Sequence, residues 1–377
     1  MAQRDMAPSV SSWWRGRGWA GTGLAALALI AALAGGGTLL VPRDGLAQGA
    51  VSWQAPDLRP VEQRYLAAAA AYSQRHGGAA MVVLHDGRMV FESYASQADR
   101  DTPRPIASGT KSFWGVAALA AVADGLMSLD EPVANTLTEW ARDPQRRAIT
   151  VRDLLTFTSG LSPGYRDLRR SADIHRAALN VGQVAQPGAL FTYGPSHLSV
   201  FGAFLDRKLG GRERPLAYLK RRILDPIGLR VGDWRTDGQG HATLAAGASL
   251  TASEWAKFGQ LLANQGGYDG RQIIPAPLMA DLTRPSRVNP RYGLTVWLNN
   301  PLPAGAEARI KGIRDIEDID FSGGVPGDLF MAAGKGDHRL YVIPSLRLVV
   351  VRLSGSARGD SSWRDGTFMR LLLTGSE

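Results

Sequence analysis

The chain of 377 residues contains no cysteine, which excludes disulfide bonds, thiolate catalysis and most structural zinc sites. Its histidines are few and show no metal-ligand spacing, so no metal site is expected from them. Lysine is scarce as well, and the net charge of +9 comes mainly from arginines spread along the chain rather than gathered in a basic run. Because no nucleic-acid-binding motif accompanies this charge, nucleic acid is not expected as a partner.

The N-terminus has the features of a bacterial export signal. Three arginines precede an apolar run of small residues over 20–41, and the small residues Gly45 and Ala47 would allow a signal peptidase to cut after Ala47. We therefore expect residues 1–47 to be a signal peptide and the protein to be periplasmic or secreted. The alternative is an uncleaved membrane anchor, because the run over 19–41 is long enough to span a bilayer. Membrane contact is expected only through this segment.

A serine and a lysine stand three residues apart in the segment 106–115. The sequence predicts a turn that opens a helix, so Ser108 and Lys111 would leave one face of that helix. A serine hydroxyl needs a neighbour that accepts its proton, and a buried lysine can do so because desolvation lowers its pKa. The helix N-terminus adds positive partial charge where an oxyanion would develop. The alternative is an N-capping serine followed by a solvated lysine.

Strand patterns lie at both ends of the chain, and helical patterns fill its middle. A β-hairpin is predicted over 79–92, with Asp86-Gly87 as its turn. Further strands are expected at 292–297, 340–343 and 346–353. Helices are expected at 60–75, 108–125, 149–160 with Thr150 as N-cap, 198–209, 215–224, 251–264 and 361–374. We predict an α+β fold in which an antiparallel sheet is flanked by the N- and C-terminal helices and joined to a mainly helical domain.

The same pattern divides residues 48–377 into two parts of one domain. Residues 48–111 and about 285–377 would form the α/β part, and about 112–284 the helical part. The connection 301–330 is long and rich in glycine, proline and charge. It is either a functional lid or a solvated surface loop.

Several segments follow one another in the order of a known family's motifs. Ser108-Gly-Thr-Lys111 is similar to the first motif, and 149–161 is similar to I-T-I-R-x-L-L-x-H-T-S-G-L, with Phe157 where histidine is common. Tyr193-Gly-Pro195 falls where the family has Tyr-x-Asn. The chain thus resembles the penicillin-recognising serine hydrolases: class C β-lactamases, D-amino-acid peptidases, and related esterases and 6-aminohexanoate-dimer hydrolases. The resemblance extends over about residues 55–375. It implies a β-lactamase/transpeptidase-like fold and a functional Ser108–Lys111 pair.

Two departures from the family pattern bear on function. Pro195 replaces the asparagine of the second motif, but Tyr193 is retained, and the resemblance implies that it shuttles protons near the lysine. The alternative for Tyr193 is a half-buried core residue. The third motif, Lys-Thr-Gly in the family's β-lactamases, corresponds here to Ala332-Ala333-Gly334.

This alignment implies oxyanion donors at the backbone N–H of Ser108 and at one near Gly334 and Lys335. The missing lysine would have gripped a substrate carboxylate, so its loss argues against a dedicated β-lactamase. Lys335 either partly replaces that cation or is a solvated lysine at the end of a strand.

These observations predict an exported serine hydrolase that forms an acyl-enzyme on Ser108 and needs no metal or organic cofactor. Its expected substrate is a carboxylic ester or a small linear amide. One alternative is a D-amino-acid peptidase or weak β-lactamase acting on cell-wall peptides or penicillins. Another is a non-hydrolytic protein that binds such molecules, an alternative supported by Pro195 in place of the asparagine of the second motif.

Four further residues have two interpretations each. His197 and His338 flank matched segments, so they either line the pocket or are ordinary polar histidines. Trp114 and Trp297 either wall an acyl pocket or pack in the core. The sequence does not exclude a Ser-His-Asp triad, but it contains no G-x-S-x-G segment of the kind that often presents the nucleophile of such a triad.

Overall fold

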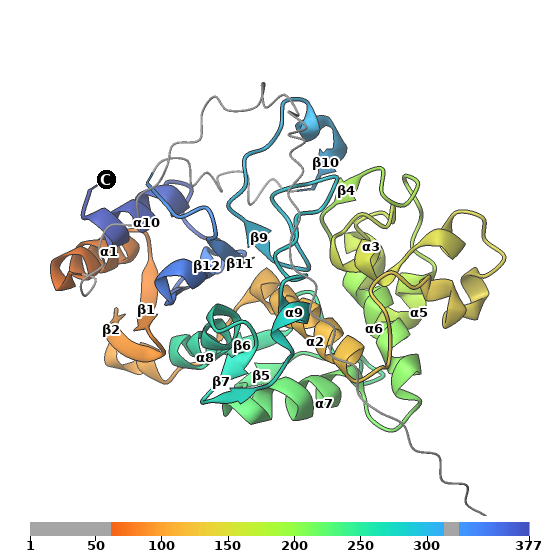
Figure 1. Cartoon of the computed structure of the whole chain (residues 1–377), viewed down its shortest axis with the longest axis horizontal. Helices are drawn as coiled ribbons and strands as arrows, with labels where there is room; N and C mark the ends of the chain where they lie inside the picture. Colours follow the sequence, from red (N-terminus) through yellow and green to blue (C-terminus); the bar gives the residue numbers. More distant parts are fainter. Residues whose placement is uncertain (1–61, 313–323, 377) are drawn as a thin grey trace, which may run out of the picture. The chain divides into compact units, whose positions relative to one another are not determined.

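A six-stranded antiparallel sheet is the centre of the structure, a computed structural model that describes residues 62–312 and 324–376 (Figure 1). These residues lie within one compact unit, Trp53–Glu377. The strand order is β2-β1-β13-β12-β11-β9. The strands are β1 (Gly78–His85), β2 (Arg88–Tyr94), β9 (Trp297–Leu298), β11 (Phe330–Gly334), β12 (His338–Ile343) and β13 (Leu348–Ser354).

The sheet is buried on both faces. Strand β1 pairs with β13 in a register that places Val82 opposite Val351, and both side chains are fully buried. Successive residues of β12 point to opposite faces, as the two-residue period of a strand requires. Leu340 lies against helix α8 (Ala252–Ala263), whereas the ring of Tyr341 lies 5.7 Å from that of Phe368 in helix α10 (Asp365–Thr374).

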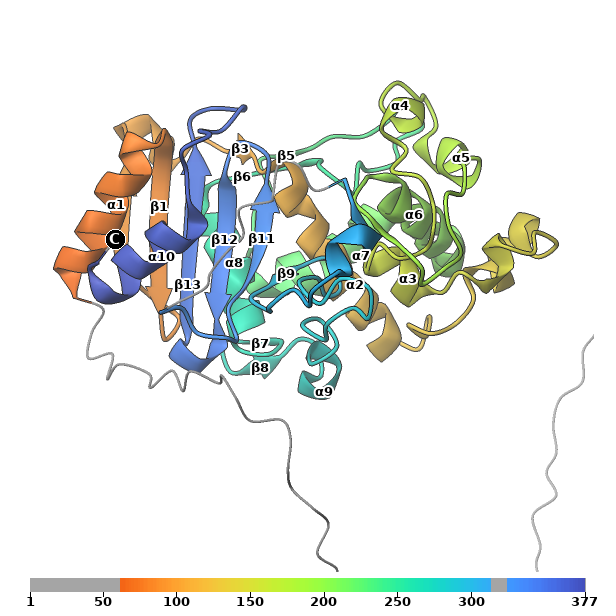
Figure 2. The same cartoon turned by 90° about the horizontal axis from the view of Figure 1, so that it is seen from above.

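The terminal helices cover one face of the sheet together, and α8 covers the other (Figure 2). Helix α1 (Gln63–Arg75) contacts α10 and β1. On the opposite face, Gly259 lets α8 approach closely, because a Cβ there would lie 2.4 Å from the side chain of Val349. The flanked antiparallel sheet of the predicted α+β fold is therefore confirmed.

The middle of the chain is mainly helical. Its helices are α2 (Ser112–Ala123), α3 (Val151–Leu155), α4 (Tyr165–Leu168), α5 (Ile174–Leu179), α6 (Ser196–Leu209), α7 (Pro215–Leu219) and α9 (Ala276–Met279). Short strands join them: β3 (Arg104–Pro105), β4 (Phe191–Thr192), β5 (Asp233–Trp234), β6 (Ala248–Leu250), β7 (Gly267–Tyr268), β8 (Arg271–Gln272) and β10 (Ile310–Lys311). Helix α2 is buried along nearly its whole length, which explains its run of alanine and other apolar residues.

Three predicted elements are shorter than their sequence patterns. The helix expected at 149–160 has its Thr150 cap but ends at Leu155, because Phe157 takes a left-handed conformation with φ 60°. The strand expected at 292–297 is a turn for most of its length, since Thr295 has φ 64° and only Trp297 continues into β9. The final helix begins at Asp365 rather than 361.

Two predictions fall on residues outside the described part. The signal peptide or anchor over 1–47 lies there entirely, and so do residues 313–323 of the connection predicted as a lid or loop. Within residues 62–312 and 324–376, no helix combines the length and the apolar character needed to cross a membrane. The proposed boundaries near 112 and 285 remain a prediction.

Candidate active site

Ser108 and Lys111 lie side by side in a 3-10 turn over Ala107–Lys111, directly before α2. The Nζ of Lys111 is 2.9 Å from the Oγ of Ser108 and donates a 2.7 Å hydrogen bond to the carbonyl oxygen of Ala245. In a 3-10 turn, side chains three residues apart eclipse one another. The two side chains thus share one face, as their spacing predicts. The sequence predicted that they lie in the first turn of an α-helix, whereas they lie in a tighter 3-10 turn before it.

Close packing holds this turn in a strained conformation. Ala107, directly before the serine, has φ 47°, which is unfavourable for a residue with a Cβ. A Cβ at Gly109 would lie 2.7 Å from the ring of Trp255 in α8, and one at Gly334 would lie 2.1 Å from the carbonyl oxygen of Ile106. Helix α8 and the end of β11 therefore press on the turn from two sides, and only glycine fits at either contact.

The environment of Lys111 favours its uncharged form. The side chain is 4% exposed, and burial lowers its pKa from 10.5 to about 7. Its hydrogen-bond partners among the described residues are a hydroxyl and a carbonyl oxygen, not a carboxylate that would hold the charge. Near neutral pH a large fraction of Lys111 is therefore a free amine beside the serine hydroxyl, able to accept its proton.

Tyr193 completes a group of three polar side chains. It follows β4, and its backbone N–H donates a 2.9 Å hydrogen bond to the carbonyl of Lys311 in β10. The Nζ of Lys111 lies 5.0 Å from the centre of the tyrosine ring. Burial raises the pKa of Tyr193 above its usual value, so the phenol stays protonated. The residues predicted from the first two motifs thus lie together.

A cluster of aromatic rings supports Tyr193. The rings of Phe157 and Trp297 lie 5.4 and 5.6 Å from it, and Tyr292 meets it edge-on at 6.3 Å. All four side chains are buried. Of the two roles considered for Trp297, the structure gives it the packing role. Trp114 is also a core residue, with its ring 5.7 Å from that of Trp234.

His197 lies beneath this cluster as a buried, neutral residue. Its Nδ1 is 2.8 Å from the hydroxyl of Ser159, and its Nε2 is 2.7 Å from the carbonyl oxygen of Thr192. Burial lowers the pKa of His197 to about 4. Its ring stacks on Phe157 at 4.9 Å, the position where the resembling family often has histidine. His197 therefore joins the segment at Ser159 to Thr192, the residue directly before Tyr193.

The third-motif region meets the nucleophile turn at one residue. Gly334, the last residue of β11, packs against Ile106 and lies close to the backbone nitrogen of Gly109. Lys335, the next residue, is exposed. His338 is buried in β12, where its Nδ1 accepts a 3.2 Å hydrogen bond from the backbone N–H of Ser354. The alignment of Gly334 with the serine therefore agrees with the packing, whereas the side chain of Lys335 points to solvent.

A cavity of about 830 Å³ opens over the Ser108–Lys111 pair. Its wall consists of α4 and the turn after it, the start of α6, and part of the segment 235–246. Pro195, the residue that replaces asparagine in the second motif, is part of this wall. The described lining contains neither of the candidate histidines 197 and 338, nor Lys335. The volume is typical of a small-molecule site.

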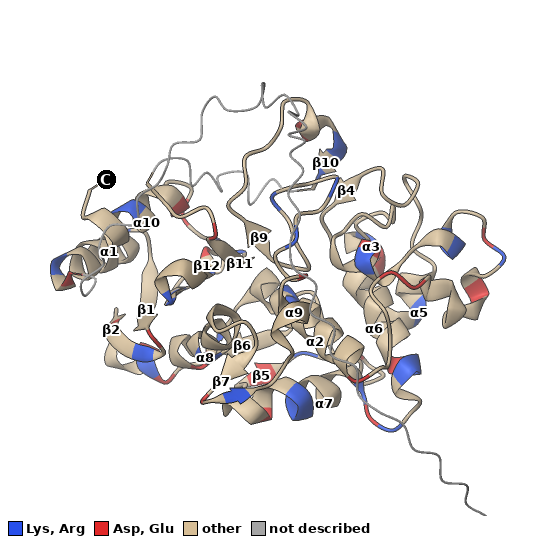
Figure 3. Ribbon diagram, viewed as in Figure 1, with Lys and Arg blue, Asp and Glu red and all other residues tan. Residues whose placement is uncertain are grey.

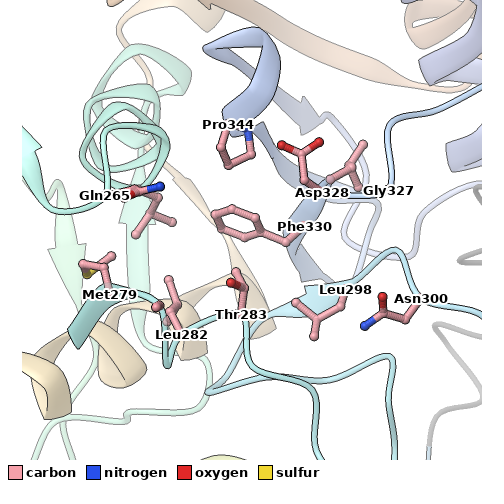
Figure 4. A pocket seen from close by; sticks show the side chains of 13 residues that line it. Gln265, Met279, Leu282, Thr283, Leu298, Asn300, Gly327, Asp328, Phe330 and Pro344 are labelled. Atoms are coloured by element: carbon pink, nitrogen blue, oxygen red, sulfur yellow. The ribbon is translucent and has the colours of Figure 1, made fainter. Parts of the chain in front are cut away.

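A second cavity, of about 350 Å³, lies at the other end of β11, around Phe330 (Figure 4). Apolar side chains such as Met279 and Leu298 share its wall with Gln265 and Asp328. The carboxylate of Asp328 accepts hydrogen bonds from the backbone N–H and the hydroxyl of Ser345. Its described lining offers no serine, lysine or histidine, so hydrolytic chemistry is assigned to the Ser108 cavity.

Two histidines far apart in sequence meet beside the cavity, which spacing could not reveal. The rings of His175 and His241 stack at 3.8 Å. The Nδ1 of His241 lies 3.0 Å from the carboxylate of Asp237. Two groups of three side chains have the spacing of metal ligands: His175, Asp206 and His241, and Asp173, Asp237 and His241. Within the described residues these sets are the geometric candidates for a cation. The two histidines are close because α5 contacts the loop between β5 and β6, where the backbone N–H of Ile174 donates a hydrogen bond to Asp237.

Comparison with known proteins agrees with this architecture. A model of the Beta-lactamase family matches residues 58–373. An uncharacterised protein of Alkalihalophilus pseudofirmus is 24% identical over 312 residues, which cover 74% of this chain and 84% of that protein. Esterase EstB of Burkholderia gladioli is 30% identical over 186 residues, covering 41% of this chain and 46% of the esterase.

Solved structures share the fold at low sequence identity. A family VIII carboxylesterase superposes with a TM-score of 0.63 and 17% identity, covering 84% of this chain and 97% of its own. Because the family match spans nearly all described elements, the chain belongs to the β-lactamase family and is a serine hydrolase of that fold.

Proposed function

We propose that the protein is an exported hydrolase that forms an acyl-enzyme on Ser108 and cleaves a carboxylic ester or small linear amide. The observation that carries the proposal is the buried Lys111, whose Nζ lies 2.9 Å from the Ser108 hydroxyl and whose pKa burial lowers to about 7. A lysine in this state can take the serine proton without a histidine–carboxylate pair.

In the first step, the amine of Lys111 accepts the proton of the Ser108 hydroxyl while Oγ attacks the substrate carbonyl carbon. The negative charge that develops on the carbonyl oxygen would be held by the backbone N–H of Ser108 and by one near Gly334 and Lys335. The bond to the leaving group then breaks, and the proton reaches that group through Lys111 and the Tyr193 phenol. The products are an alcohol or amine and an ester on Ser108.

In the second step, water replaces the departed group in the cavity. The amine of Lys111 accepts a proton from this water as its oxygen attacks the acyl carbon, with the protonated Tyr193 phenol acting as a relay. When the acyl–Oγ bond breaks, the proton returns to Oγ and a carboxylic acid leaves. Each residue thus ends in its starting protonation state, and the cycle consumes one water.

Ester or linear amide substrates are favoured over penicillins by two observations. The third-motif lysine is absent and Lys335 is exposed, so no lysine from that strand faces the cavity wall within the described residues. A relative named Esterase EstB and a neighbour titled a carboxylesterase add support for ester cleavage. Pro195 in the second motif is the feature that would fit a non-hydrolytic binding protein instead.

The test is hydrolysis of p-nitrophenyl acetate and butyrate by the full-length chain and by Ser108→Ala. Ser361→Ala, at an exposed serine outside the cavity wall, is the matched control. We expect turnover to disappear only in Ser108→Ala, and intact-mass spectrometry to detect an acyl group on the control protein. Equal turnover in both variants would refute the proposal. Turnover of a chromogenic cephalosporin faster than of any ester would favour the β-lactamase alternative.

Export is the second part of the proposal and has its own experiment. Residues 1–47 carry the arginines, apolar run and small residues of a signal peptide. N-terminal sequencing of the protein recovered from a bacterial periplasm should give Gln48 as the first residue. A mature chain that begins at Met1 and stays in the membrane fraction would support the anchor instead.

A further inference from the structure

Three arginines line one wall of the Ser108 cavity. Arg166 lies in α4, and Arg169 and Arg170 follow in the turn after it. Positions i, i+3 and i+4 of a helical turn share a face, so the three guanidinium groups come from one side of this short segment. Arg235 contributes a fourth guanidinium to the same wall, where it donates a hydrogen bond to the carbonyl oxygen of Ala246.

The guanidinium groups of these three arginines have no carboxylate partner in the part of the chain that the structure describes, unlike those of several other arginines in the helical part. Basic and acidic residues are interspersed over the elements (Figure 3), and Arg207 and Arg222 pair with Glu139 and Asp124, respectively. By contrast, the guanidinium groups of Arg166, Arg169 and Arg170 form no ion pair or hydrogen bond with another residue of the described ranges.

The one carboxylate on the described cavity wall, Asp237, does not offset this charge. It accepts hydrogen bonds from the backbone N–H groups of Ile174 (2.7 Å) and His241 (2.8 Å) and contacts the His241 ring at 3.0 Å. Its oxygens are therefore engaged by its own loop and by the start of α5. The arginines of this cavity wall therefore carry a positive charge that Asp237 does not neutralise and that an anionic ligand could bind.

We infer that the hydrolase selects esters or amides that carry a carboxylate or phosphate-type group a few bonds from the scissile carbonyl, and that Arg166, Arg169 and Arg170 bind this group. The inference rests on the proposed function of the Ser108 cavity. Guanidinium groups match the planar oxygen pairs of carboxylates and phosphates, and a cavity concentrates their field on a ligand that enters it. The volume of about 830 Å³ suits a small molecule that reaches from Ser108 to this wall.

The experiment compares two substrates of equal length, p-nitrophenyl butyrate and mono-p-nitrophenyl succinate, which differ in a terminal carboxylate. A third substrate, p-nitrophenyl 3-phosphonopropionate, separates a phosphate-type preference from a carboxylate preference. The full-length chain is measured beside the triple variant Arg166→Gln/Arg169→Gln/Arg170→Gln. The matched control, Arg88→Gln/Arg142→Gln/Arg358→Gln, removes the same charge from exposed positions outside the cavity wall.

We expect the wild-type protein and the control to prefer an anionic ester over butyrate in kcat/KM. In the cavity triple variant this ratio should fall by roughly tenfold or more, since each lost charge-assisted hydrogen bond weakens anion binding. Added salt should lower the wild-type ratio as well. An unchanged ratio in the cavity variant, or an equal fall in the control, would overturn the inference.

A binding measurement separates this inference from the proposed catalysis. Calorimetric titration of monomethyl succinate into Ser108→Ala protein needs no turnover, and the three arginine substitutions on that background should remove the binding. If this holds while no ester is hydrolysed, the anion site stands and the hydrolytic proposal fails. If the substitutions leave the ester preference intact and instead abolish co-sedimentation with phosphatidylglycerol vesicles, the arginines serve a membrane surface and the inference is wrong.

Discussion

Two of the buried basic side chains in the described residues, Lys111 and Arg339, are held in different ways. Arg339 in β12 is 5% exposed, and its guanidinium pairs with the buried Asp365 of α10 through bonds of 2.8 and 3.2 Å. Burial alone would lower the pKa of Arg339, but the charge of Asp365 raises it above its usual value. Lys111 is equally buried, yet its partners are neutral oxygens, and its pKa falls to about 7.

The difference separates a structural cation from a reactive one. A buried charge with a carboxylate partner is fixed and joins two elements, here the sheet and α10. A buried amine without such a partner gives up its proton near neutral pH, at the expense of native-state stability. Because Lys111 is buried without a counter-charge, it can accept the proton of Ser108 and so activate this serine as a nucleophile. Substitution of Lys111 itself, and of Asp365 beside Arg339, tests the contrast between the two cations.

The largest expected effect is that of Lys111→Met on activity. Without the amine, nothing in the described cavity wall takes the serine proton, so kcat/KM for p-nitrophenyl butyrate should fall by about 10³-fold or more. The same change should stabilise the fold. The unfolded lysine binds a proton up to about pH 10.4, whereas the folded one holds it only below about 7. The penalty thus grows as pH falls between these values and is fully present below them.

Urea denaturation at pH 7 measures this gain, which should be on the order of 1–4 kcal/mol. Lys257→Met is the control, because that lysine makes a partly exposed ion pair with Glu254 and should change stability by less than about 1 kcal/mol. A Lys111→Met protein that stays active would contradict the role of Lys111 as proton acceptor. One that is strongly destabilised would contradict its burial without a counter-charge.

Asp365→Asn tests the other cation and should mainly reduce stability. It removes the hydrogen-bonded counter-charge of the buried Arg339 and, within the described residues, leaves only Asp337, at 3.7 Å. The free energy of unfolding should therefore fall by roughly 3–5 kcal/mol, as urea denaturation would measure. The control is Asp86→Asn, whose partner Arg347 is exposed, with an expected loss of about 0–1 kcal/mol. Folded Asp365→Asn protein should keep its esterase activity. Equal losses in the two variants would mean that burial does not distinguish these pairs.

Local features of the sequence predicted one of these two sites and not the other. The Ser108–Lys111 spacing fixes two side chains on one turn, so their contact follows from neighbouring residues alone. Arg339 and Asp365 belong to separate elements, and the helix itself was expected to begin before Asp365. The hairpin at 79–92 and the strands near the C-terminus were predicted for the same local reason.

What escaped prediction depends on long-range packing. The left-handed conformation of Phe157 ends a helix that its sequence pattern continues, and the pairing of His175 with His241 follows from the contact of α5 with the loop between β5 and β6. The arginines at 166, 169 and 170 looked like part of a dispersed charge until the fold placed them over Ser108.

A smaller effect is expected for Tyr193→Phe, which removes one hydroxyl from the Lys111 environment. The ring and its aromatic neighbours remain, so stability should change little, but kcat should fall by about 10²-fold because proton transfer to the leaving group loses its relay. Tyr292→Phe is the control, since it removes a hydroxyl from the same aromatic cluster. Steady-state kinetics on both variants decide the point. Equal activity in the two would leave Tyr193 with the packing role alone.

The smallest effect, and the most direct measure of the contrast, is the pH dependence of the wild-type protein. Because only the uncharged amine of Lys111 can accept the serine proton, kcat/KM for a neutral ester should rise with pH and level off above about 7. Below that value it should fall about tenfold per pH unit. Arg339 keeps its proton throughout this range, so the compensated cation should add no second step. A midpoint near 10 would mean that Lys111 is hydrated like a surface lysine, and a flat profile down to pH 5 would mean that another group takes the proton.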